Sequence, residues 1–108
     1  MKIKELKLYN KYKDKNYPEI ELIYIGIDNE NDYWFLYKHK DYNLSLARLK
    51  LYGLDPDKIV KKLNLDIVID VNGYKCIEGY NVLWYKKEDI EINFKPILKD
   101  KLKNILNR

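Results

Sequence analysis

Residues 19–39 read EIELIYIGIDNENDYWFLYKH, in which two apolar and aromatic runs flank a turn rich in Asp and Asn. Residues 19–27 place β-branched and aromatic side chains on both sides of an extended chain, which is typical of a central strand. Residues 28–32 supply turn formers, and residues 33–39 return as a second aromatic strand. This stretch therefore predicts a β-hairpin inside a sheet.

The C-terminal half of the chain predicts more antiparallel pairing. We expect a four-stranded meander with strands over residues 65–71, 74–78, 82–86 and 90–94. The first and second strands join through Asn72-Gly73, which is the preferred pair for a type I′ turn, and the second and third join at a turn around Gly79.

Helical signals lie between and after these strands. Asn43 is a candidate N-cap for a helix that stops at Gly53, and Asp55 caps a helix over residues 56–63 that has Pro in its first position. Lys95-Pro96 opens a terminal helix. Its shared apolar face consists of Leu98, Leu102, Ile105 and Leu106.

The N-terminal end is less regular. Residues 2–9 fit either a short helix or an entering strand, and residues 10–17 fit a loop that ends before Pro18. Together these patterns predict a single α+β domain over residues 1–108. It has a small antiparallel sheet of about five or six strands, packed with two or three helices.

Side chains that perform catalysis or bind metals are scarce. The chain has no Thr and one each of Ser, Cys and His, which are Ser45, Cys76 and His39. A zinc site needs about four Cys or His ligands, and no glycine belongs to a phosphate-binding loop. A Cys76–His39 pair and a pair of carboxylates remain as alternatives, but neither lies in an activating context. We therefore expect no enzyme, no cofactor and no metal.

Composition and termini indicate where the protein acts. Lys, Ile, Asn and Tyr, whose codons are AT-rich, dominate the chain, which is typical of a low-GC bacterium, its phages, or some archaea and their viruses. No apolar run approaches the roughly 18 residues that span a bilayer. The start lacks the apolar region of a secretory signal, and one cysteine cannot form an internal disulfide. We expect a soluble cytoplasmic protein, in its own cell or in the host cell of a virus.

Aromatic residues concentrate on the predicted strands, beyond what one small core covers. Exposed Tyr and Trp on a rigid sheet are typical of protein-binding surfaces. The candidate protein-binding residues are Tyr33, Trp34, Tyr37, Tyr80, Trp84 and Tyr85. This favours a small inhibitor from a phage or mobile element that occludes a host defence protein. The alternative is that helices, or a second copy of the chain, cover these rings.

Positive charge is segregated to the two ends of the chain. Residues 1–17 and 95–108 each carry a net charge of +4, whereas residues 18–94 carry −4. If the ends meet, they form one basic patch that phosphates can use. The candidate nucleic-acid-binding residues are Lys11, Lys13, Lys15, Lys95, Lys99 and Lys103. With only two Arg for base readout, such binding is expected to be sequence-nonspecific. The other interpretation is a solvated charged surface.

Overall fold

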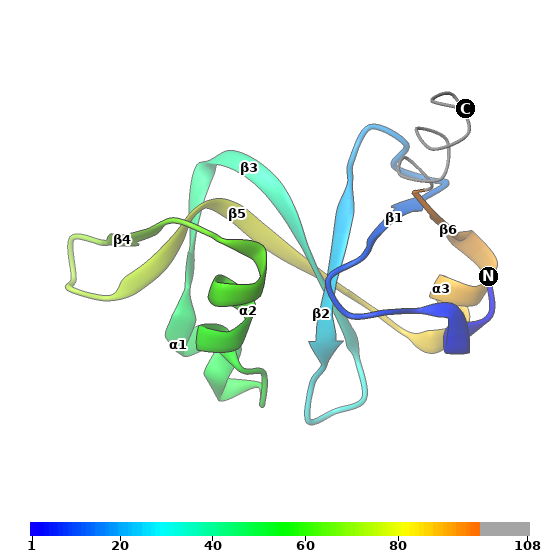
Figure 1. Ribbon diagram of the computed structural model, residues 1–108, viewed down its shortest axis with the longest axis horizontal. Helices are drawn as coiled ribbons and strands as arrows, with labels where there is room; N and C mark the ends of the chain where they lie inside the picture. Colours follow the sequence, from blue (N-terminus) through cyan, green and yellow to red (C-terminus); the bar gives the residue numbers. More distant parts are fainter. Residues whose placement is uncertain (98–108) are drawn as a thin grey trace, which may run out of the picture.

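The computed structural model describes residues 1–97, and within them six strands form one antiparallel sheet that is covered by three α-helices. The elements in chain order are η1 (Ile3–Glu5, a 3-10 turn), β1 (Lys11–Asp14), β2 (Leu22–Ile27), β3 (Tyr33–Ser45), α1 (Leu46–Leu51), α2 (Pro56–Leu63), β4 (Ile67–Ile69), β5 (Lys75–Tyr85), α3 (Lys87–Asn93) and β6 (Phe94–Pro96). The strand order is β4-β5-β3-β2-β1-β6 (Figure 1). This arrangement confirms the predicted α+β class.

The predicted hairpin of residues 19–39 is confirmed and lies in the middle of the sheet. β2 pairs with β3 from Ile23 opposite Leu36 to Ile27 opposite Tyr33. β3 then pairs with β5 on its other side, so the hairpin has neighbours on both edges. The hairpin is therefore central in the sheet, and a central strand can be buried on both of its faces.

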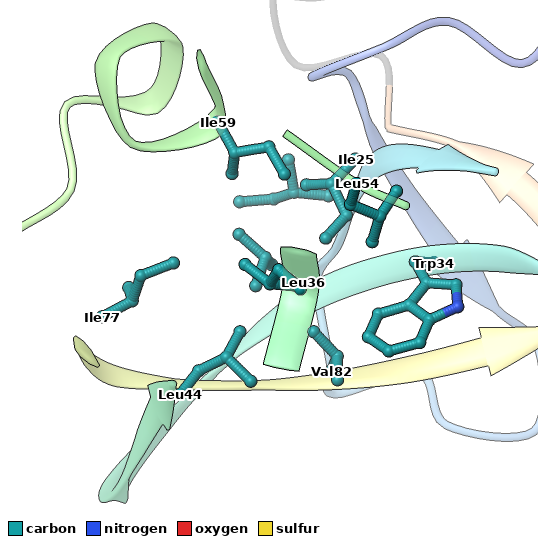
Figure 2. Close-up of a cluster of buried hydrophobic side chains, with 10 residues drawn as sticks. Ile25, Trp34, Leu36, Leu44, Leu54, Ile59, Ile77 and Val82 are labelled. Atoms are coloured by element: carbon teal, nitrogen blue, oxygen red, sulfur yellow. The ribbon is translucent and has the colours of Figure 1, made fainter. Parts of the chain in front are cut away.

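Two hydrophobic clusters use the two faces of this sheet. Helices α1 and α2 cover one face, which we call the α1/α2 face, and enclose a cluster that includes Trp34, Leu36 and Ile59 (Figures 1 and 2). The opposite α3 face carries a second cluster around Phe35 and Ile90. Successive residues of β3 thus enter different cores, as the period of a strand requires.

The predicted turn around Gly79 is wrong, because β5 runs without reversal from Lys75 to Tyr85. The interruption lies on its partner strand. The register passes from Lys38 opposite Tyr80 to Asn43 opposite Glu78, so residues 39–42 bulge out of β3 opposite Gly79. A bulge bends a strand locally instead of reversing it.

The predicted last strand over residues 90–94 is also wrong, because residues 87–93 form α3. Glu88 and Asp89 stabilise the helix N-terminus, and Ile90 and Phe94 lie four positions apart and are both buried in the second cluster. Ile92 is 68% exposed, so the apparent alternation does not mark one buried face. Four predicted strands in this half therefore reduce to β4, β5 and the short β6.

The chain ends differ from the prediction as well. Residues 11–14, expected to be a loop, form β1, in which Tyr12 and Asp14 are buried and the intervening lysines are exposed. Lys95-Pro96 lies in β6 rather than opening a helix, and the rest of the predicted terminal helix lies outside the described residues. Within residues 2–9 the structure has a 3-10 turn at Ile3–Glu5.

Of the two predicted helix N-caps, one is confirmed and the other is wrong. The helix over 56–63 is confirmed, with the Asp55 side chain accepting a hydrogen bond from the Lys58 N–H at 3.1 Å. Asn43 is not a cap, because β3 continues to Ser45 and α1 starts at Leu46. The β4–β5 connection is confirmed as a hairpin, but its turn is not type I′, since Gly73 has a positive φ (85°) and Asn72 does not.

We expect Gly26→Ala to destabilise the protein by about 1–3 kcal/mol, measured by urea unfolding. Gly26 has a φ of 131° next to a register shift in β2, and an added Cβ would lie 3.0 Å from Leu54 Cδ2 in the first cluster. Gly73→Ala is the matched control, because its φ is also positive but its surroundings are open. Equal losses in the two variants would contradict the packing argument.

Candidate protein-binding surface

The turn between β2 and β3 is organised by one carboxylate. Asp28 Oδ1 accepts hydrogen bonds from the backbone N–H groups of Glu30 (2.8 Å) and Asp32 (3.0 Å). Its Oδ2 accepts the indole N–H of Trp34 at 2.6 Å. Because a buried indole needs a partner for its N–H, this contact fixes the ring and the turn together.

The same contacts set the ionisation of Asp28. Burial acts to raise the pKa of this carboxyl, but the backbone N–H of Asp32, the indole of Trp34 and the backbone N–H of Glu30 act in the opposite direction. The charge of Lys86 adds to them, and the net pKa lies below its usual value. Asp28 therefore stays ionised in neutral solution.

A second carboxylate joins the turn to β5. The buried Asp32 pairs through Oδ1 with Lys86 Nζ at 2.5 Å, just after the end of β5. The hydrogen bond and charge of Asp32 raise the pKa of Lys86. This ion pair holds the end of β5 beside the turn.

Two tryptophans stack next to this turn on the α1/α2 face. Trp34 on β3 lies directly opposite Trp84 on β5, with ring centroids 5.6 Å apart and planes inclined by 27°. Trp34 is 2% exposed and also contacts Tyr52 at 5.1 Å, whereas Trp84 is 53% exposed. A buried ring thus supports a solvent-facing one.

Arg48 of α1 completes the group. Its guanidinium carbon lies 6.0 Å from the Trp34 ring centroid and 5.8 Å from that of Trp84. Its Nη1 donates to the hydroxyl of Tyr42 at 3.4 Å. These distances lie at the outer end of the range for cation–π attraction.

Between the turn and the rings lies a pocket of about 130 Å³, which we call the Trp84 pocket. Its acidic side consists of Asp28, Glu30 and Asp32, and its other side of Trp34, Tyr52, Trp84 and Arg48. Three carboxylates and one guanidinium line it, and together with Lys86, which is paired with Asp32, they carry a net formal charge of −1. Its chemistry suits a cationic side chain with an apolar stem.

The six predicted protein-binding residues do not form one surface. The strand alternation places Trp34, Tyr80 and Trp84 on the α1/α2 face and Tyr33, Tyr37 and Tyr85 on the α3 face. Trp34 is buried, the four tyrosines are partly buried against the two clusters, and Trp84 alone of the six is exposed. Burial strongly raises the pKa of Tyr85.

Sequence reasoning missed Arg48, Tyr52 and the carboxylate turn as neighbours of Trp84. Asp28, Glu30 and Asp32 were visible in the sequence, but only as part of a turn rich in Asp and Asn. Its role in accepting backbone and indole N–H groups follows from the hairpin register.

The predicted basic residues meet in part. β1 and β6 are neighbours, and Lys13 lies directly opposite Lys95. Lys11 pairs with Glu21 at 3.5 Å, Lys15 lies just beyond β1, and Lys99 and Lys103 lie outside the described residues. Residues 1–97 contain 17 Lys and Arg against 16 Asp and Glu, so most of the net charge belongs to residues 98–108.

A more open hollow of about 690 Å³ lies beside Lys11. Lys11, Lys38 and Tyr80 line it, and so do the acidic residues Glu19 and Glu21. Its charged lining is therefore balanced, in contrast to the Trp84 pocket.

The remaining reactive side chains have structural surroundings. Cys76 is buried, and burial together with the nearby Asp70 raises the pKa of its thiol. His39 lies in the exposed bulge between the rings of Tyr37 and Tyr42. Within residues 1–97, no group of three or more His, Cys, Asp or Glu is placed to hold a metal ion. The same residues include no helix long and apolar enough to cross a membrane.

Comparison with known proteins finds no match, whether with family models, curated proteins or solved structures.

We expect Asp28→Asn to cost about 1–3 kcal/mol of unfolding free energy at neutral pH. The amide can keep one acceptor oxygen, but its NH2 group would face the indole N–H of Trp34 or the backbone N–H groups, leaving donors unpaired. Urea unfolding measures the loss, with Asp57→Asn on the exposed face of α2 as the control. Similar small losses in both variants would contradict the role given to Asp28.

The pH dependence of the folding stability provides a second test of the role of Asp28. Because its pKa is lower in the folded than in the unfolded protein, Asp28 contributes stability above the ordinary value of 3.8. That contribution disappears as the pH falls through the folded-state value. We therefore expect the stability difference between wild type and Asp28→Asn to shrink on acidification below about pH 4, as measured by thermal unfolding.

Proposed function

We propose that this chain is a non-enzymatic binding protein that recognises another protein through the Trp84 pocket. The supporting observation is a half-exposed Trp84 that is held rigidly on Trp34, with Arg48 and Tyr52 beside it. Trp, Tyr and Arg dominate binding hot spots because they bury large areas at little entropic cost. A pre-organised ring on a sheet needs no rearrangement before it binds.

The charge of the pocket supports a particular kind of partner. A protein loop that presents Arg or Lys can place its cation against the exposed Glu30 while its stem packs on Trp84, since Asp28 already accepts three N–H groups and Asp32 is paired with Lys86. The partner is therefore a protein with a basic, protruding side chain.

The biological role that we propose is occlusion of a host protein, including a defence protein, by a product of a phage or mobile element. Three features of the sequence support it: 108 residues, AT-rich composition and few reactive side chains. A chain of this kind acts by covering a surface on its target. The covering surface in this proposal is smaller than the whole aromatic sheet, since five of the six predicted aromatic residues are buried or partly buried.

The test is differential affinity purification from the host with wild type, Trp84→Ala and Tyr17→Ala. Tyr17 is similarly exposed and does not line the pocket. We expect a host protein that is recovered with wild type and Tyr17→Ala and is lost with Trp84→Ala. Calorimetry with that purified protein should show at least about a tenfold weaker affinity for Trp84→Ala. Recovery of the chain alone, or equal recovery by all three, would end the proposal.

A second candidate is sequence-nonspecific nucleic-acid binding at the β1–β6 edge. The observation that favours it is Lys13 directly opposite Lys95, because facing like charges are unfavourable unless an anion bridges them. The hollow beside Lys11 also contains Lys38 and, on β5 opposite Lys38, the ring of Tyr80, on which a base can stack.

Fluorescence anisotropy with single-stranded and duplex probes at two salt concentrations tests this candidate. If the candidate is right, Lys13→Glu with Lys95→Glu weakens binding strongly, and wild-type affinity falls steeply as salt rises. Lys61→Glu with Lys62→Glu on α2 is the charge-matched control. Absence of binding at low salt, or binding without salt dependence, would count against it.

A further inference from the structure

Within residues 1–97, no strand pairs with the outer side of the edge strand β4. It pairs with β5 on one side, at Ile67 opposite Ile77, Val68 opposite Cys76 and Ile69 opposite Lys75, and it is the last strand of the sheet. Hydrogen bonds from Glu78 N–H to Asp66 O and from Asp70 N–H to Tyr74 O show which residues face β5. By the alternation of an antiparallel ladder, Ile67 and Ile69 direct their N–H and C=O groups outward.

The side chains at this edge are apolar and exposed. Ile69 is 62% exposed, Ile67 is partly exposed, and Val71 and Tyr74 at the tip of the hairpin are exposed as well. β4 itself contains no charge and no proline, which are the residues that usually keep an edge strand from pairing. In Figure 1 the β4–β5 hairpin projects away from the rest of the molecule. Such an edge is a template for another strand.

Acidic residues surround this apolar strand. Asp66 precedes β4 and Asp70 follows it. Glu78 on β5 lies opposite Asp66, with a hydrogen bond of 3.0 Å between their backbones. Since even-numbered residues of β4 share one face, the three carboxylates lie on the same side of the hairpin.

These charges argue against a second copy as the occupant. When two β4 strands pair antiparallel with full overlap about Val68, Asp66 of each copy lies opposite Asp70 of the other. A parallel pair brings each aspartate close to its own counterpart. Both arrangements therefore set carboxylates against carboxylates, which destabilises a strand pair. A strand with basic residues at its ends would instead set cations against these carboxylates, which stabilises a strand pair.

We propose that β4 accepts an added strand from another protein, namely an extended apolar segment flanked by Lys or Arg. The outward N–H and C=O groups of Ile67 and Ile69 supply main-chain hydrogen bonds, and the exposed apolar side chains supply contact area. The exposed carboxylates of Asp66 and Glu78 select the basic flanks, and Asp70, whose carboxylate accepts the N–H groups of Asn72 and Tyr74, adds its charge. This surface is separate from the Trp84 pocket, because Trp84 lies near the other end of β5. The two sites can therefore succeed or fail independently.

The test uses two fluorescein-labelled peptides, KVTITVK and its acidic counterpart EVTITVE, in anisotropy titrations with the full chain. We expect saturable binding of the basic peptide and at least about a tenfold weaker binding of the acidic one. Ile69→Pro removes an outward N–H without breaking the ladder to β5, so it should abolish binding. Trp84→Ala should bind the basic peptide like wild type, which separates this result from the proposed function.

Replacing carboxylates by lysines gives a test that a loss of folding cannot mimic, because the expected result is a reversed preference between the two peptides. Asp66→Lys with Glu78→Lys, both at exposed positions, should reverse the preference toward the acidic peptide. Equal affinity of wild type for both peptides, no binding at about 1 mM, or unchanged binding in Ile69→Pro would overturn the proposal. A dimer in sedimentation that Ile69→Pro dissociates would also overturn it, because a second copy would then occupy the edge.

Discussion

The hydrogen bond from the Trp34 indole to the Asp28 carboxylate connects the turn, the core and the surface of this protein. The carboxylate holds the turn through two backbone N–H groups, and the indole that it anchors fills the cluster under α1 and α2 (Figure 2). The same ring is the base on which Trp84 stacks. A charge-assisted bond in a buried setting is strong and directional, so this interaction fixes the ring on which the exposed tryptophan stacks.

Burial on both faces of β3 explains why so aromatic a chain exposes few of its rings along the sheet. Trp34 and Leu36 enter one cluster and Phe35 enters the other, so consecutive residues contribute to different cores. Small helices suffice to cover each face because each cluster is small. The rings that remain accessible lie where this coverage ends, at the ends of strands and in the bulge of β3. Binding surfaces in this fold are therefore expected at its margins.

Local sequence signals predicted the central hairpin, the capped helix over 56–63 and the β4–β5 pairing, because each depends on residues that are close in the chain. The errors arose where the structure of a segment depends on partners that are distant in the sequence. Gly79 is typical of a turn, but in the structure it lies within β5 opposite the extra residues of β3. The strand β1 can be recognised only from its pairing with its two neighbouring strands. The Trp84 pocket combines β3, β5, α1 and a turn, so its composition follows from the register and not from any motif.

The lone cysteine has a consequence for how this fold can be observed. Cys76 lies opposite Val68 in β4 and opposite Ser45 in β3, and it is 2% exposed. Thiol reagents react with a thiolate that is in contact with solvent. While the strands stay paired, burial keeps the Cys76 thiol protonated and out of contact with solvent. The rate at which a chromogenic disulfide labels the native chain therefore reports how often these strands separate, with no engineered probe.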